Sequence, residues 1–214
     1  LIKSLPLIVK TFAGAMKSIS GAGATSNERT AQDINIKIVI IAILVLTLLV
    51  WIIPAIPVSL LGAFIVVIFG FFFATVSSRM VGLVGSSNNP VSGMAIATLL
   101  IATLILKVTG AEGAAGMASA IAIGSIICIV SAIAGDTSQD LKTGYILGAT
   151  PKKQQTGELI GVIASALAIG GTLYLLDSAW GFGSDELGAP QASLMKLIVE
   201  GFMGGNLPWA LVFT

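Results

Sequence analysis

Five stretches of this chain are apolar enough to form helices that cross a lipid bilayer, and this limits the chain to very few folds. They occupy residues 36–53, 58–76, 91–106, 114–135 and 157–176. A spanning helix needs about 20 mostly apolar residues, and in lipid only helices and closed barrels satisfy all their backbone hydrogen bonds. The sequence therefore predicts an all-α fold, a polytopic transmembrane helical bundle with about five spans, plus a polar break or re-entrant segment.

The composition also indicates a protein that lies in lipid. Hydrophobic residues make up 56% of the 214, charged residues make up 10%, and the mean hydropathy is +1.01. A soluble domain carries about 25% charged residues, so this chain has too few to cover a globular surface. The net charge of +1 gives no reason to expect a nucleic-acid partner. We expect the lipid bilayer to be its main surroundings.

Basic residues are unevenly distributed between the two sides that five crossings would create. The side that holds residue 1 would carry nine of the 11 Lys and Arg residues, and the other side would carry Lys107 and Lys196. Acidic residues divide evenly and do not affect the comparison. Because short cytoplasmic loops are enriched in Lys and Arg, we expect the side of residue 1 to be cytoplasmic.

The chain divides into four regions on this interpretation. Residues 1–35 form a cytoplasmic loop or an amphipathic lead-in, residues 36–176 form the bundle, and residues 177–206 form an extracytoplasmic loop. That loop contains a weaker amphipathic helix at 193–203, with Leu194, Leu197 and Ile198 on one stripe. Residues 207–214 are expected to start a further apolar segment, so we interpret the chain as part of a longer protein.

Small residues spaced four apart form two ridges, at 116–124 and 157–165. Such ridges let the backbones of neighbouring membrane helices approach closely. They favour a packed bundle over separate membrane anchors.

The segment 77–90, between the second and third stretches, is rich in Gly, Ser and Asn. Non-helical backbone at membrane depth is tolerated where it is buried in protein or lines a cavity, and broken helices form the substrate sites of many transporters. We therefore expect substrate-binding residues in this region, namely Ser86, Ser87, Asn88, Asn89 and Ser92. The alternative interpretation is an ordinary cytoplasmic turn in which Asn89-Pro90 starts the next helix.

A second polar segment follows the fourth stretch. Asp136 and Asp140 are four residues apart, so a continuing helix would place both on one face. A carboxylate held partly out of water is a plausible proton or cation carrier. We group Asp136, Asp140, Lys142, Tyr145 and Glu158 as candidates for proton coupling or gating. The alternatives are a solvated helix end followed by a loop and, for Glu158, a carboxylate that complements the helix dipole.

The following stretch contains a helix start. Thr150 is expected to cap the helix and Pro151 to occupy its first turn. Lys152 and Lys153 are expected to reach towards lipid headgroups. No phosphate-binding glycine loop and no His-Glu-x-x-His motif occurs, and the chain has no histidine, so we expect no enzyme, no cofactor and no resident metal.

Two segments carry a resemblance to a known family. Residues 136–161, with Gln139-Asp140-x-Lys142-Thr143-Gly144-Tyr145 at their core, and Gly85-Ser-Ser-Asn-Asn-Pro-Val-Ser-Gly-Met94 resemble the oligopeptide transporter (OPT) family. Within it, the resemblance is to the yellow-stripe-like branch and its prokaryotic members. It extends over nearly the whole chain, although family members are much longer.

This resemblance implies a proton-coupled symporter in the inner membrane of a bacterium. Its substrates would be short peptides, glutathione-like molecules or metal–chelate complexes such as metal–nicotianamine. Its other partners would be protons and the remaining spans of the full-length transporter. Peptide-branch members carry an Asn-Pro-Gly motif, whereas Val91 follows Asn89-Pro90 here, which weighs against a eukaryote-type peptide specificity.

The substrate, the coupling ion and the oligomeric state stay open at this point. Two other classes of function also stay open, namely a channel-like permeation module without coupling and a non-transporting membrane scaffold or receptor. Gradient-driven accumulation of a solute would distinguish a transporter from both.

Overall fold

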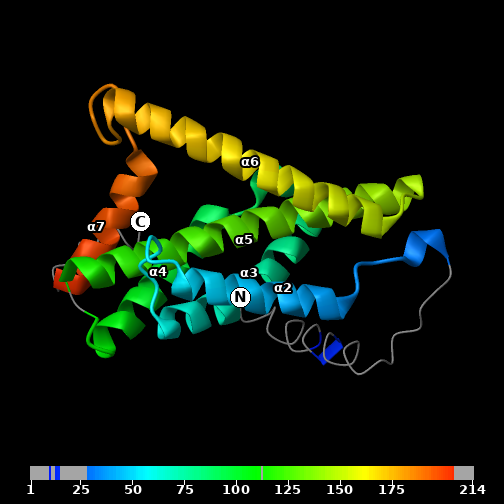
Figure 1. The fold of residues 1–214 in the computed structure, drawn as a ribbon, viewed down its shortest axis with the longest axis horizontal. Coiled ribbons are helices and arrows are strands. Elements are labelled where there is room, and N and C mark those ends of the chain that lie inside the picture. The colour runs from blue at the N-terminus through cyan, green and yellow to red at the C-terminus, as the bar shows by residue number, and fades with distance from the viewer. Residues whose placement is uncertain (1–9, 11–12, 15–27, 112, 205–214) are drawn as a thin grey trace.

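The computed structural model describes residues 10, 13–14, 28–111 and 113–204. In that part of the chain six α-helices follow one another, with the short 3-10 helices η2 and η3 before and between them (Figure 1). Their bounds are η2 Arg29–Ala31, α2 Ile36–Ile52, α3 Leu60–Val84, η3 Ser86–Asn88, α4 Val91–Val108, α5 Gly113–Leu147, α6 Pro151–Trp180 and α7 Pro190–Gly204. Helices α2 to α6 are long and apolar enough to cross a membrane. The prediction of an all-α bundle with about five spans is confirmed.

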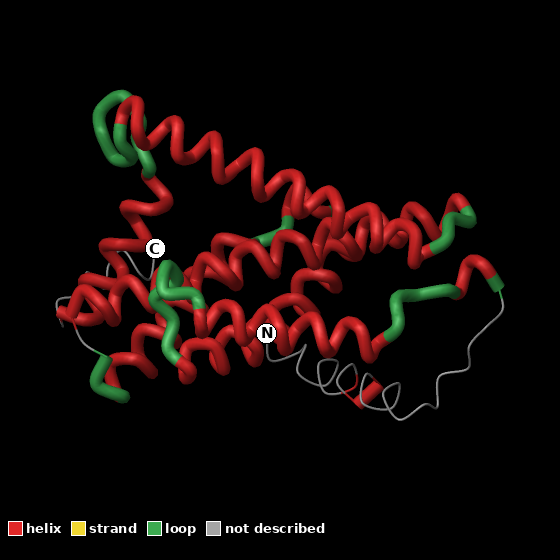
Figure 2. The backbone as a smooth tube through the Cα atoms, viewed as in Figure 1, coloured by secondary structure: helices red, strands yellow, loops and turns green. Residues whose placement is uncertain are grey.

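The core lies where α3, α4 and α5 pack together, with α7 across one end (Figures 1 and 2). Its largest fully buried side chains include Leu99, Leu106, Ile123 and Ile127. The contact between α3 and α5 is the most extensive of the molecule. These three helices therefore bury two apolar clusters, one around Leu99 and Ile123 and one around Phe73 and Ile127, to which α2 and α6 contribute no buried residue.

Glycines on α5 let its neighbours approach closely. Leu99 of α4 packs over Gly124, where an added Cβ would lie 2.9 Å from Leu99 Cγ. Asn89 packs in the same way over Gly135, at 2.8 Å from its Nδ2 atom. The expected ridge at 116–124 is thus used in packing, whereas an added Cβ at Gly157 or Gly161 on α6 would meet nothing within 4 Å.

Polar segments next to the apolar stretches continue the helices instead of breaking them. Helix α3 runs to Val84, so the prediction that residues 77–84 are non-helical is wrong. The reason lies in the neighbouring helix α5, because the Ser77 and Ser78 hydroxyls donate to carbonyls of α5 rather than competing for their own backbone. The helix ends at Gly85, whose φ of 87° suits glycine.

Helix α5 likewise continues through the acidic segment as far as Leu147. At 1.5 Å per residue its 35 residues extend over about 50 Å, well beyond the ~30 Å of a hydrocarbon core. Helix α6 begins at Pro151, which occupies the first turn as predicted. Thr150 occupies the N-cap position as predicted, but its side chain makes no capping hydrogen bond and is buried.

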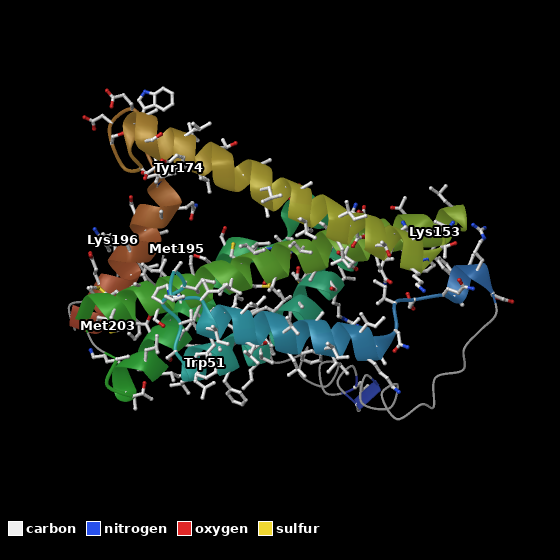
Figure 3. The ribbon with its side chains drawn as sticks, in the orientation of Figure 1. Trp51, Lys153, Tyr174, Met195, Lys196 and Met203 are labelled. Atoms are coloured by element: carbon white, nitrogen blue, oxygen red, sulfur yellow. The ribbon has the colours of Figure 1, made fainter. Side chains whose placement is uncertain are left out.

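Helix α7 presents a different face to the core from the predicted stripe. Val199 is fully buried, with Met195 and Met203 packed around it (Figure 3). Leu194 and Leu197 are exposed. Flexible methionines fill the irregular space over α4 and α5, which a sequence pattern does not reveal.

The segment 29–35 ties the start of α6 to the start of α2. We refer to it as the 29–35 strap. Its four hydrogen bonds run from Arg29 Nη2 to Gly148 O (2.9 Å), from Lys152 N to Gln32 O (2.8 Å), from Ile34 N to Gln155 Oε1 (3.0 Å) and from Gln155 Nε2 to Asp33 Oδ1 (3.3 Å). Neither α2 nor α6 has a buried residue, so little side-chain packing holds them. The hydrogen bonds of the strap are therefore an important connection between these two helices at this end of the bundle.

Gly124 offers a direct test of the packing between α4 and α5. Because Leu99 is fully buried, Gly124→Ala is expected to lower the free energy of unfolding by about 1–3 kcal/mol. Gly82 on α3 has open space around it, so Gly82→Ala is expected to be neutral or to stabilise by about 0.5–1 kcal/mol. Thermal unfolding of the full natural polypeptide in detergent measures both variants. Equal midpoints would contradict the close contact.

Candidate functional site

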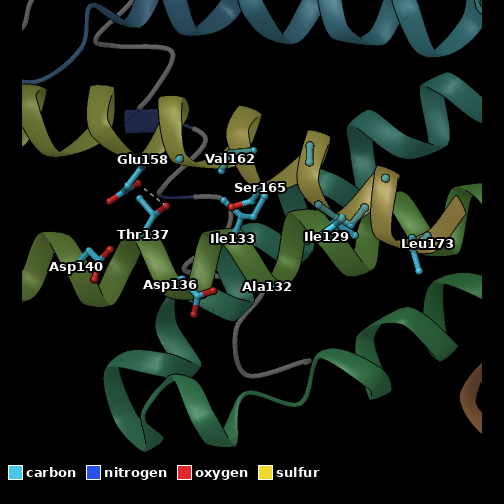
Figure 4. A pocket seen from close by; sticks show the side chains of 14 residues that line it. Ile129, Ala132, Ile133, Asp136, Thr137, Asp140, Glu158, Val162, Ser165 and Leu173 are labelled. Carbon is cyan, nitrogen blue, oxygen red and sulfur yellow. Dashed lines mark hydrogen bonds between the residues drawn. The ribbon is translucent and has the colours of Figure 1, made fainter. Parts of the chain in front are cut away.

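A cleft of about 730 Å³ lies between α5 and α6 (Figure 4). Helix α5 contributes one face at helical spacing, with Ile129, Ile133, Asp136 and Asp140 along it. Most residues along the cleft are apolar, and its acidic residues lie near the turn that joins α5 to α6. We refer to the whole as the α5–α6 cleft and to the end with the carboxylates as its acidic end.

Three carboxylates line the acidic end, Asp136 and Asp140 from α5 and Glu158 from α6. Thr137 Oγ1 donates a hydrogen bond of 2.7 Å to Glu158 Oε2 (Figure 4). The other oxygen of Glu158, Oε1, is buried and has no hydrogen-bond partner within the described part of the chain. The residues that line the cleft include no Lys or Arg, so its field favours positively charged groups.

The Thr137–Glu158 contact joins α5 to α6 at the acidic end of the cleft. Asp136 and Asp140 are exposed, which leaves the acidic end open on their side. The arrangement can therefore attract a positively charged group to this end of the cleft.

Lys142 and Tyr145 lie outside the cleft. The Lys142 Nζ atom is 5.8 Å from the centre of the Tyr145 ring, and the Tyr145 side chain is largely exposed. Such an exposed cation–π contact is worth about 0.5–1 kcal/mol. The structure thus brings Asp136, Asp140 and Glu158 together and leaves the other two predicted coupling residues apart from them.

The predicted substrate-binding residues belong to the loop around η3 and the start of α4, and they pack near a different face of α5 from the one that borders the cleft. Asn89 Nδ2 donates to Ser77 Oγ at 2.6 Å, and Ser77 Oγ in turn donates to the carbonyl oxygen of Ser131. The backbone N–H of Ser86 donates to Gln139 Oε1 at 3.1 Å. These bonds fasten the loop that contains η3 to α3 and α5, opposite the face that borders the α5–α6 cleft.

Asn88 and Ser92, which also belong to the predicted substrate-binding group, are exposed and less firmly bonded. Asn88 Nδ2 reaches Val84 O at 3.4 Å in an exposed position, and Ser92 is exposed in the first turn of α4. The Ser87 side chain lies outside the described part of the structure. None of these five residues lines the α5–α6 cleft, so the two predicted groups do not form a common site.

A second hollow, of about 610 Å³, lies beside this loop between the ends of α3 and α5. We refer to it as the α3–α5 hollow. Its lining is more polar than that of the cleft and consists of Val81, Gly82, Ser138, Gln139, Leu141, Lys142 and Thr143. Because Gln139 also holds Ser86, the hollow and the predicted substrate-binding loop are neighbours.

Sequence reasoning missed three residues of these arrangements, namely Thr137, Ser77 and Ser131. The position of Thr137 was available from the sequence, because it lies four residues after Ile133 and three before Asp140 on the same helical face. Ser77 and Ser131 carried no such signal, since their contact joins residues 54 positions apart.

Taken together, the long apolar helices and the interhelical polar contacts define a polytopic integral membrane protein. A family model described as OPT oligopeptide transporter protein matches residues 6–214. A candidate oligopeptide transporter of Haemophilus influenzae is 32% identical over an alignment 241 positions long, which covers 97% of this chain. The chain belongs to the OPT oligopeptide transporter family. It spans 38% of the length of that relative. No solved structure matches it.

Asn89 and Asn88 form a matched pair for testing the loop. Asn89→Ala removes a donor from the buried Ser77 hydroxyl and is expected to lower the free energy of unfolding by about 1–2 kcal/mol. Asn88→Ala removes a long, exposed contact and is expected to change it by less than about 0.5 kcal/mol. Thermal unfolding of the full natural polypeptide compares them. A larger loss for Asn88→Ala would contradict the bonding described for the loop.

Proposed function

We propose that this chain is part of a secondary active transporter that couples the movement of short peptides to a flow of protons. The observation that carries the proposal is Glu158, whose one oxygen is bonded by Thr137 while its other oxygen is buried without a partner in the described structure. Membership of the oligopeptide transporter family supports the transport of peptides. The choice of the proton as the coupled ion rests on the geometry of the cleft.

Glu158 binds the coupled proton in this mechanism, and Thr137 holds its carboxyl group in place. The bond between them is kept when the carboxyl is protonated, because the hydroxyl then accepts instead of donating. Asp136 and Asp140 draw protons towards Glu158 from the open side of the cleft. Carboxylates within membrane-spanning helices mark ion pathways in other membrane proteins.

The α3–α5 hollow is the proposed place of contact with the substrate. Lys142 can pair with the carboxylate end of a peptide, and Gln139 and Thr143 offer neutral hydrogen-bonding groups. The neighbouring Ser86, Ser87, Asn88, Asn89 and Ser92 remain the proposed substrate-binding loop, with Asn89 also holding it in position. Glutathione-like molecules and metal chelates present similar carboxylates and are the other substrates to test.

The end of the bundle that carries the acidic end of the cleft is proposed to face the cytoplasm. Arg29, Lys37, Lys142, Lys152 and Lys153 lie at the ends of the elements that meet there. Positive charge of this kind marks the cytoplasmic side of membrane proteins. The bacterial origin of the relative supports a bacterial inner membrane as the location.

Glu158→Gln tests the proton site, because glutamine keeps a hydrogen bond to Thr137 but cannot release a proton. The full natural polypeptide in proteoliposomes is expected to lose accumulation of labelled tripeptide driven by a proton gradient, down to the background of empty vesicles. Exchange of internal for external tripeptide without a gradient is expected to continue. Asp185→Asn, an exposed carboxylate between α6 and α7, is the matched control and is expected to behave as wild type.

The same assay separates the other classes of function. If the wild-type protein equilibrates tripeptide but never concentrates it, the protein is a channel-like module. If no peptide, glutathione or metal chelate moves, it is a scaffold or receptor. If Glu158→Gln accumulates tripeptide as wild type does, the proton site lies elsewhere.

Asn88→Ala and Lys142→Ala test the substrate-binding region. Each is expected to raise the KM for uptake by about tenfold, the effect of losing an interaction of about 1.4 kcal/mol. Neither change is expected to alter the thermal midpoint, because both side chains are exposed. An unchanged KM in both variants would remove the α3–α5 hollow and its loop from the substrate site.

A further inference from the structure

We propose that the apolar length of the α5–α6 cleft receives another membrane-spanning helix of the same polypeptide, one that lies outside these 214 residues. This interface is independent of the proton site proposed above, which occupies the acidic end. The proposal rests on the shape of the cleft, on the small residues that border it and on the length of the family member that this chain resembles.

The cleft has the shape of a helix-binding groove. Helices α5 and α6 lie close together near the turn that joins them and diverge along their length, until the loop 181–189 and α7 lead back to the bundle (Figures 1 and 2). Ile129 and Ile133 face it from α5, and Val162 and Ile169 face it from α6. The spacing of three or four residues on each side is the spacing at which one helix packs on another.

Small residues on α6 border this groove, and its glycines have open space beside them in the described part of the chain. Gly161 and Ser165 line it, and an added Cβ at Gly161 or Gly170 would meet nothing within 4 Å. A glycine inside a helix costs about 1 kcal/mol relative to alanine, and in membrane helices small residues allow close backbone contact. On α5 the comparable Gly124 is covered by Leu99. The uncovered glycines of α6 therefore indicate a contact that the described helices do not provide.

Helix α2 offers a comparison with α6 within the same chain. It too has no buried residue, but its sequence IKIVIIAILVLTLLVWI contains no glycine and no serine. Its exposed side chains are large aliphatics and Trp51. Lipid tails cover such a surface without small residues, so the difference between α2 and α6 points to protein rather than lipid in the cleft.

The length of the relative indicates where the incoming helix comes from. The alignment covers 38% of the Haemophilus influenzae protein, which leaves more than half of its length to supply further spans. A helix tethered in the same chain has a high effective concentration at the cleft, whereas a second copy must first associate.

Photo-crosslinking on the full natural polypeptide in its membrane tests this directly. Benzoylphenylalanine placed at Ile169 faces the cleft, and the same residue placed at Leu167 faces away, because two residues rotate a helix by about half a turn. Leu167 is 76% exposed and does not line the cleft, which makes it the matched control. The Ile169 variant is expected to give an adduct at the mass of the monomer that maps to a segment outside residues 1–214. The Leu167 variant is expected to give no protein adduct.

Three results would overturn the proposal. An adduct at the mass of a dimer would assign the cleft to a second copy. An adduct that maps within residues 1–214 would assign it to this part of the chain. The absence of any protein adduct from Ile169, with lipid adducts in its place, would leave the cleft to lipid. The readout involves no transport, so its failure is separate from failure of the proton site.

A pair of substitutions gives a second, independent measurement. Gly161→Leu fills the space through which the incoming helix would approach and is expected to lower the thermal midpoint of the full polypeptide. Leu167→Trp adds bulk to the opposite face of α6 and is expected to leave the midpoint unchanged. Equal midpoints for Gly161→Leu and wild type would show that nothing packs closely on this face.

Discussion

The close approach of other elements to α5 is the contact on which the rest of the structure depends. Four buried glycines along this helix each meet a different neighbour: Gly116 meets Met203 of α7, Gly124 meets Leu99 of α4, Gly135 meets Asn89 of the loop after η3, and Gly144 meets Gln154 of α6. In lipid there is little hydrophobic force between helices, so such packing and the interhelical hydrogen bonds provide the cohesion. A larger side chain at Gly124 would push Leu99 and with it α4 away, whereas at Gly144 the end of the flexible Gln154 side chain would move first.

The same helix keeps two polar arrangements apart. Ser131 and Gly135 face α3, where the Ser77 and Asn89 side chains are bonded, whereas Thr137 faces α6 and bonds Glu158 (Figure 4). Each arrangement contains buried oxygen atoms with no partner among the described residues. Because the helix between them is rigid and close packed, a change on one face can reach the other by movement of α5 as a unit. This gives a physical basis for coupling between the proposed proton site and the proposed substrate site.

The apolar spans could be predicted from the sequence because in lipid the length of an apolar run nearly decides the structure. The polar extensions could not. Residues 77–84 are helical because α5 accepts hydrogen bonds from Ser77 and Ser78, and those partners lie more than 50 residues away. Part of the candidate site was readable, since the four-residue spacing of Asp136 and Asp140 places them on one face. That Glu158 joins them depends on how α6 folds back on α5, which no local pattern specifies.

The bonds that hold α6 are concentrated at one end of the helix. Gln154 Nε2 donates to Asp140 O, Gln155 bonds the 29–35 strap and Glu158 accepts from Thr137, and these three residues lie within the first eight of the helix. Beyond Glu158, α6 diverges from α5 and has no buried residue. The other end of α6 is connected to the core through the loop 181–189 and α7, whose Val199 is buried there. The helix is therefore held at its two ends, and its apolar middle is the part that a helix in the cleft would support.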